Sequence, residues 1–98
     1  MEDESSPALP EGFELHQNAP NPFNPQTTIA FSLPEGGQVT VEIFNAAGQI
    51  VATLVDNFLV AGNHAVVWDA NGFAGGIYLC RVKVDGYVIG TRKMLLTK

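Results

Sequence analysis

His64 and Asp69 are the two side chains whose types and nearness in the sequence could hold a metal ion or transfer a proton. They lie in an alternating run, residues 64 to 69, that predicts a β-strand. Residues five apart on a strand point to opposite faces, so without a bulge the two cannot serve one ion. We therefore expect His64 to be a structural histidine.

The segment Asp69-Ala70-Asn71-Gly72 carries a fragment of the spacing found in calcium-binding loops. It lacks the further oxygen ligands and the closing glutamate of such a loop. We expect Asp69 to close a turn, with calcium binding as the alternative.

Nucleophilic catalysis also lacks the residues it needs. Cys80 is the single cysteine, with no second Cys or His cluster nearby, so it is expected to be a core thiol. Ser32 falls in the middle of a predicted strand, and no phosphate-binding glycine loop precedes a helix. The sequence predicts a protein that is not an enzyme and has no cofactor.

The elements that position these residues are all predicted to be strands. Ninety-eight residues make one domain, and a 46% hydrophobic content with 15% charged residues excludes disorder. Alternation predicts an inward face made by Ile29, Phe31 and Leu33, and a later one that buries Trp68. No stretch keeps a 3.6-residue period. We expect an antiparallel, immunoglobulin-like sandwich of about seven strands without a helix, over residues 13–15, 28–33, 39–44, 49–55, 64–69, 77–84 and 87–97.

Turn signals separate these strands. Residues 45–48 end in Gly48, expected in the left-handed region, and Asp85-Gly86 predicts a two-residue hairpin turn. Residues 56–62 are expected to form a loop.

Residues 17–25 contain three prolines, which exclude a helix and ladder pairing there. Phe23, held on this stiff loop, is expected to cover an open end of the core. Residues 1–12 are rich in Glu, Ser, Pro and Gly and are predicted to be a linker, so the domain spans 13–98.

Charge is uneven along the chain. Residues 1–80 carry nine carboxylates and no Lys or Arg, whereas residues 81–98 carry five cations and Asp85 alone. Either this basic hairpin pairs with acidic neighbours inside the fold, or it offers a positive face to a partner. Five cations on an acidic domain argue against nucleic acid as that partner.

Carbohydrate binding is the other class of function that the residue types allow. Phe44, Phe58, Phe73 and Tyr87 are candidate exposed aromatics, but they are scattered through the sequence. Three coplanar exposed rings would favour a carbohydrate-binding module. A structural immunoglobulin-like spacer is a further alternative.

Five motifs in order resemble one family. They comprise Pro20, Asn21, Pro22, Phe23, Asn24 and Pro25, then Asn45 and Gly48, then Gly62, His64, Trp68 and Asp69, then Gly76, Tyr78 and Arg81, and finally Lys93, Met94 and Lys98. Together, over residues 13–98, they closely resemble the type A C-terminal sorting domain of the type IX (Por) secretion system. The fold is expected to be similar to that of the immunoglobulin-like domain of flagellar hook-capping proteins.

The resemblance implies that the domain is a non-catalytic sorting signal for a cargo protein fused to its N-terminus. Such cargo reaches the periplasm by a separate signal, passes the outer-membrane translocon and ends secreted or on the cell surface. The resemblance also implies a sortase-like peptidase that cuts upstream, here within 1–12. We expect a monomer whose translocon-recognised surface includes Arg92, Lys93, Met94 and Lys98.

Overall fold

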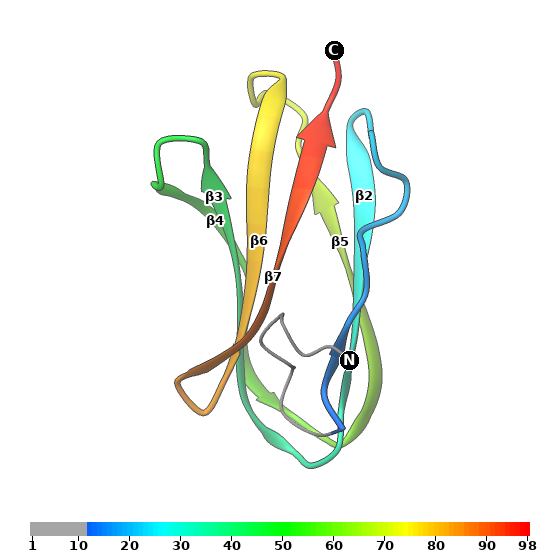
Figure 1. The fold of residues 1–98 in the computed structure, drawn as a ribbon, viewed down its shortest axis with the longest axis vertical. Helices are drawn as coiled ribbons and strands as arrows, with labels where there is room; N and C mark the ends of the chain where they lie inside the picture. Colours follow the sequence, from blue (N-terminus) through cyan, green and yellow to red (C-terminus); the bar gives the residue numbers. More distant parts are fainter. Residues whose placement is uncertain (1–11) are drawn as a thin grey trace, which may run out of the picture.

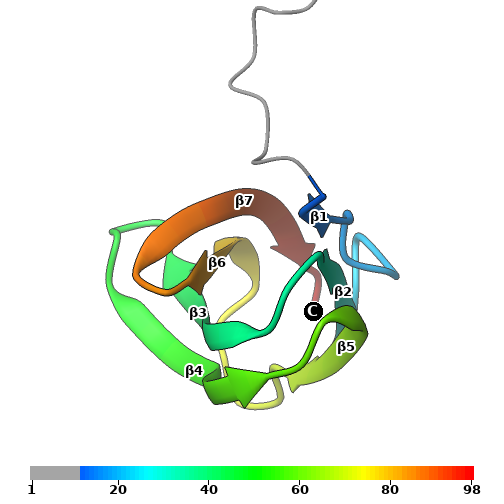
Figure 2. The ribbon, with the colours of Figure 1, turned by 90° about the horizontal axis from the view of Figure 1, so that it is seen from below.

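The computed structural model describes residues 12–98, which form two antiparallel sheets packed face to face (Figures 1 and 2). One sheet has the order β1-β2-β5 and the other β4-β3-β6-β7. The strands are β1 (Glu14–Leu15), β2 (Gln26–Leu33), β3 (Gly37–Asn45), β4 (Ile50–Leu59), β5 (Gly62–Asp69), β6 (Gly76–Val84) and β7 (Tyr87–Leu96). No helix occurs over 12–98, so none there could span a membrane. The predicted immunoglobulin-like sandwich of seven strands is confirmed. Apart from Gly12, the predicted linker lies outside the described residues.

The core forms where the two inner faces meet, and the predicted alternation is confirmed. Ile29, Phe31 and Leu33 of β2 are buried, and Trp68 of β5 is only 2% exposed. In β6 the inward residues are Tyr78, Cys80, Val82 and Val84. Because side chains alternate between the two faces of a strand, these buried residues also determine which side chains face outward.

The predicted loop over 56–62 is wrong. Strand β4 continues to Leu59 and β5 begins at Gly62, which leaves two residues to connect the sheets. The segment 56–59 pairs regularly with residues 37–40 of β3, although Asp56 and Asn57 are residue types that are rare in strands. Leu54 and Val51 have no partner on β3, so the side chains of β4 lose the strict period of two that marks a strand in a sequence.

The predicted turns are confirmed. Gly48 has a φ of 85° in the turn after β3, where the Asn45 side-chain oxygen accepts hydrogen bonds from the backbone N–H groups of Ala47 and Gln49, each at 3.0 Å. Asp85 and Gly86 both have positive φ, 52° and 87°, as the two-residue turn between β6 and β7 requires.

Candidate functional site at the C-terminal strand

Strand β7 is an edge strand of the four-stranded sheet, and the proline-rich loop closes the upper part of its free edge. The Phe23 N–H donates to the Leu95 carbonyl at 2.9 Å, and the Thr97 N–H donates to the Phe23 carbonyl at 2.9 Å. The Leu95 N–H is held by the Asn21 side-chain oxygen at 2.9 Å. This part of the edge is therefore not available to pair with another strand.

The expectation that three prolines exclude ladder pairing across residues 17–25 is wrong at two positions. Ala19 forms a bridge with Thr28, and Phe23 forms a parallel bridge with Leu96. Both residues keep the backbone N–H that proline lacks, and both use it. The loop is thus tied to β2 at one end and to β7 at the other.

Phe23 fills the space between this loop and the core, as predicted. It is 2% exposed, and its ring centroid lies 5.7 Å from that of Trp68. Trp68 also contacts Phe73 and Tyr78, with centroid distances of 5.5 and 5.2 Å. The motif aromatics therefore form one cluster at this end of the sandwich.

Arg92 spans the two sheets. It shares a face of β7 with the buried Met94, and its guanidinium donates two hydrogen bonds to the Leu15 carbonyl of β1, 3.1 Å from Nε and 2.8 Å from a terminal nitrogen. Nearby, the Gln17 side chain donates to the Lys93 carbonyl at 2.8 Å. Arg92 and Met94 thus lie on the side of β7 that faces the other sheet.

Lys93 points to the opposite side, away from the core. It is exposed and lies directly across from Leu79 of β6. Lys98 follows β7 and lies beside Gly75, where an added Cβ would be 3.0 Å from the Lys98 Cγ. Lys98 is five positions after Lys93, which is about 16 Å along an extended chain. The four predicted recognition residues therefore do not form one cluster.

Some cations of the basic hairpin, residues 81–98, pair with an acidic neighbour inside the fold, and others remain available to a partner. Arg81 and Lys83 lie 3.4 and 3.5 Å from the carboxylate of Glu42, which is 9% exposed on the outer face of β3. The Arg81 guanidinium also lies 4.4 Å from the Phe44 ring centroid. These two cations pair within the fold, whereas no carboxylate of residues 12–98 pairs with Lys93 or Lys98.

The other polar motif residues hold turns and strand ends. The His64 Nε2 lies 2.7 Å from the Val60 carbonyl, and its ring stacks on Phe31 at 5.6 Å. The Asp69 carboxylate accepts the Asn71 N–H at 2.9 Å, which is the turn-closing role predicted for it. Over 12–98 no three His, Cys, Asp or Glu side chains gather in a way that could bind a metal ion.

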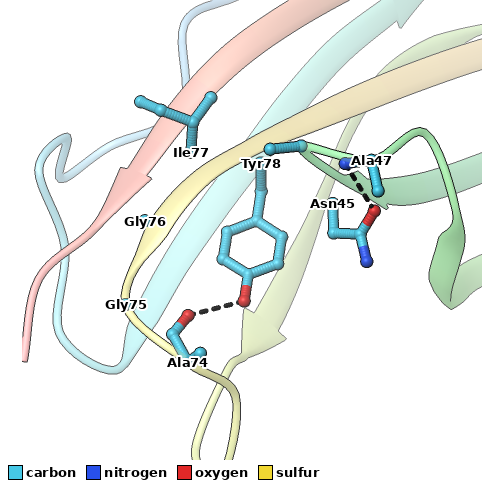
Figure 3. A pocket seen from close by; sticks show the side chains of 8 residues that line it. Asn45, Ala47, Ala74, Gly75, Gly76, Ile77 and Tyr78 are labelled. Carbon is cyan, nitrogen blue, oxygen red and sulfur yellow. Dashed lines mark hydrogen bonds between the residues drawn. The ribbon is translucent and has the colours of Figure 1, made fainter.

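An open hollow of about 290 Å³ lies between the turn after β3 and the segment before β6 (Figure 3). Its polar side chains are Asn45, which is used by the backbone of its own turn, and Tyr78, whose hydroxyl donates to the Ala74 carbonyl at 2.6 Å. A tyrosine that bonds back across this corner is typical of immunoglobulin-like sandwiches. The hollow thus offers neither a general base nor a nucleophile.

The candidate aromatics do not form a platform. Phe58 and Tyr87 are 61% and 77% exposed, but Phe44 lies beneath Arg81 and Phe73 packs against Trp68. Two exposed rings fall short of the three that a carbohydrate-binding module would need.

The fold and this site define an immunoglobulin-like module whose polar side chains secure its edges and corners. The family model described as "Secretion system C-terminal sorting domain" matches residues 19–97. The chain belongs to this family and is thereby a C-terminal sorting signal of type IX secretion. The family is non-catalytic, and its members are secreted through that system.

Two further comparisons add no argument about function. The search of curated proteins returned no match. Among solved structures, the chain is similar to the Pseudomonas fluorescens alkylpurine DNA glycosylase AlkC bound to DNA containing an abasic site analog, with a TM-score of 0.49 and 17% identity. That similarity covers 95% of this chain and 32% of the glycosylase chain.

Sequence reasoning missed one group of exposed residues. Ile77 and Leu79 are exposed apolar residues at outward positions of β6, alternating with the buried Tyr78 and Cys80. The signal was present in the sequence, because an apolar residue at an outward strand position is unusual. What the sequence could not show is which residues of the adjacent strands lie beside them.

Proposed function

We propose that this domain directs an N-terminally fused cargo through the outer-membrane translocon of the type IX system, without catalysing a reaction itself. Family membership supports the sorting role, and the closed edge of β7 carries the argument for this domain. Because the proline loop and Arg92 fix the terminal strand against the fold, its outward face is a rigid surface that a receptor can read.

In this proposal the cargo reaches the translocon from the periplasm, and a sortase-like peptidase then cuts upstream of the sandwich, within residues 1–12. The cargo ends secreted or attached to the cell surface. The domain acts as a monomer, without a cofactor or nucleic acid.

Lys93 and Lys98 are the residues we expect the translocon to contact. Both are exposed and neither pairs with a carboxylate of residues 12–98. Arg92 and Met94 support this surface from behind, Arg92 through the Leu15 carbonyl and Met94 through complete burial.

The experiment places residues 1–98 behind a periplasm-targeted fluorescent protein, in a host with and without a working type IX translocon. Export that requires both the translocon and residues 1–98 supports the proposal. Equal retention in the two hosts contradicts it and favours a spacer or binding module.

The recognition residues are tested in the same host with a Lys93→Ala, Lys98→Ala double variant. We expect export to fall while the thermal unfolding midpoint stays that of the parent domain. Unchanged export by the folded variant would remove both lysines from the recognised surface.

A further inference from the structure

Apolar side chains from all four strands meet on the outer face of the four-stranded sheet. One cross-strand row runs from Ile50 through Phe44 to Leu79, each residue directly opposite the next. The adjoining row pairs Ile77 with Leu95. We call this set, Phe44, Ile50, Ile77, Leu79 and Leu95, the outer apolar patch.

The patch is open to solvent except at Phe44, whose ring lies under the Arg81 guanidinium. Ile50 is 53% exposed, Ile77 41%, Leu95 37% and Leu79 36%. Figure 3 shows Ile77 and Tyr78 on opposite sides of β6, with Tyr78 toward the other sheet. Directly opposed side chains on a sheet lie about 5 Å apart, so the patch is continuous across the strands.

The outer face of the three-stranded sheet differs in kind. At its centre Thr28 pairs with Val67 and Ala30 with Ala65. Val67, at 55%, is the exposed large apolar residue of this face within residues 12–98. A single exposed valine needs no explanation, whereas a contiguous patch on one face marks an interaction surface.

The charges around the patch indicate what kind of surface covers it. Lys93 continues the first row, directly opposite Leu79. Glu42, the acidic residue of the next row, is already bound by Arg81 and Lys83. The patch is therefore bordered by positive charge, and a complementary partner brings a carboxylate to Lys93.

We propose that the outer apolar patch and Lys93 together form the docking surface for a protein partner whose apolar surface carries a carboxylate. This inference rests on the proposed function, in which that partner belongs to the translocon. The apolar contacts supply the affinity, and the Lys93 ammonium fixes the register of the partner on the sheet.

The first test is export of the fused fluorescent protein carrying the double change Ile77→Thr, Leu79→Thr. Threonine keeps strand propensity while it removes apolar contact area. We expect export to fall about tenfold, the loss typical of removing a central interface anchor. Val67→Thr is the control, at a position on the other sheet that is more exposed than Ile77 or Leu79, and it should export like the parent.

The second test varies Lys93 alone. Lys93→Arg keeps the charge and should export nearly normally, whereas Lys93→Met keeps the length and loses the ammonium. We expect Lys93→Met to reduce export severalfold and Lys93→Glu to abolish it. Equal export by the Arg, Met and Glu variants would overturn the assignment of a carboxylate to the partner.

Two occupants other than the translocon have distinct outcomes. If the patch binds a second copy of the chain, sedimentation of the purified domain shows a dimer that Ile77→Thr, Leu79→Thr dissociates. If the patch binds the fused cargo, the same patch variant should be exported to different extents with different cargoes. Either result overturns the translocon as the partner.

Export of the parent domain tests the proposed function separately from the docking surface. Failure of the parent to be exported sinks the proposed function itself. Normal export of both parent and patch variants, with matching thermal unfolding midpoints, leaves the sorting function standing and refutes the docking surface.

Discussion

Arg92 and Lys93 are adjacent in the sequence, yet the structure gives them different roles, and replacing each by methionine separates these roles. Methionine preserves most of the length and the apolar stem of either side chain. In Arg92→Met the two hydrogen bonds to the Leu15 carbonyl, at 2.8 and 3.1 Å, are lost. Lys93→Met keeps the hydrogen bond that the Gln17 side chain donates to the backbone carbonyl at this position.

The size of the Arg92 effect follows from its surroundings. A hydrogen bond to a charged donor contributes about 1.5–3 kcal/mol. Arg92 is exposed, so water replaces part of the interaction in the variant, and we expect a loss of about 1 kcal/mol. In a domain of this length that loss lowers the thermal midpoint by about 4–8 °C. Lys93→Met should change the free energy of unfolding by less than about 0.5 kcal/mol.

Urea unfolding followed by the fluorescence of Trp68, the single tryptophan and a core residue, measures both variants. The expected result is a lower midpoint with an unchanged slope for Arg92→Met and the parent curve for Lys93→Met. Equal stability of Arg92→Met and the parent would refute the contact between the sheets. Export of the fused reporter should show the reverse order, because Lys93→Met should be exported less than Arg92→Met.

Three further predictions concern the corner, the core thiol and a turn. Tyr78→Phe removes the bond to the Ala74 carbonyl and should cost about 1 kcal/mol, whereas Tyr87→Phe, on a residue 77% exposed, should cost nothing measurable by the same urea titration. Burial raises the pKa of the Cys80 thiol from 9.0 to about 12, so the folded state keeps a proton that the unfolded chain releases. Stability should therefore fall as pH rises from 9 toward 12, by at most about 1.4 kcal/mol per pH unit, and a Cys80→Val variant titrated with urea at several pH values should lack this component. Gly86→Ala places a side chain at a φ of 87° and should destabilise the domain by about 1 kcal/mol in a thermal melt, with an unchanged midpoint counting against a strained turn.

The fold was predictable where side-chain burial alternates strictly and turns are marked by glycine. Strand β6 and its turn at Asp85 and Gly86 meet both conditions, and their prediction is confirmed. Strand β4 does not, because the unpaired Val51 and Leu54 shift its faces, and because it continues through Asp56 and Asn57, residue types rare in strands, into the range predicted as a loop. A bulge depends on the partner strand, which a local pattern does not contain.

The site was less predictable, because it depends on register between distant strands. The burial of Phe23 and Trp68 followed from their size and local setting. The bond of Arg92 to the Leu15 carbonyl joins residues 77 apart, and the Glu42 pair with Arg81 joins residues 39 apart. No pattern within either segment indicates these contacts, so the division of the cations between structure and surface became visible only in the fold.

The tie between Phe23 and the end of β7 has a consequence for how the chain is made. Phe23 has its partners in Leu95, Leu96 and Thr97, more than seventy residues later. During synthesis the loop around Phe23 must wait for these residues, since ribosomes add about 5–20 residues per second and the last strand emerges last. A product cut short before them by a premature stop or a protease lacks the strand that completes the sheet. The sorting domain is thus complete only when translation has passed β7.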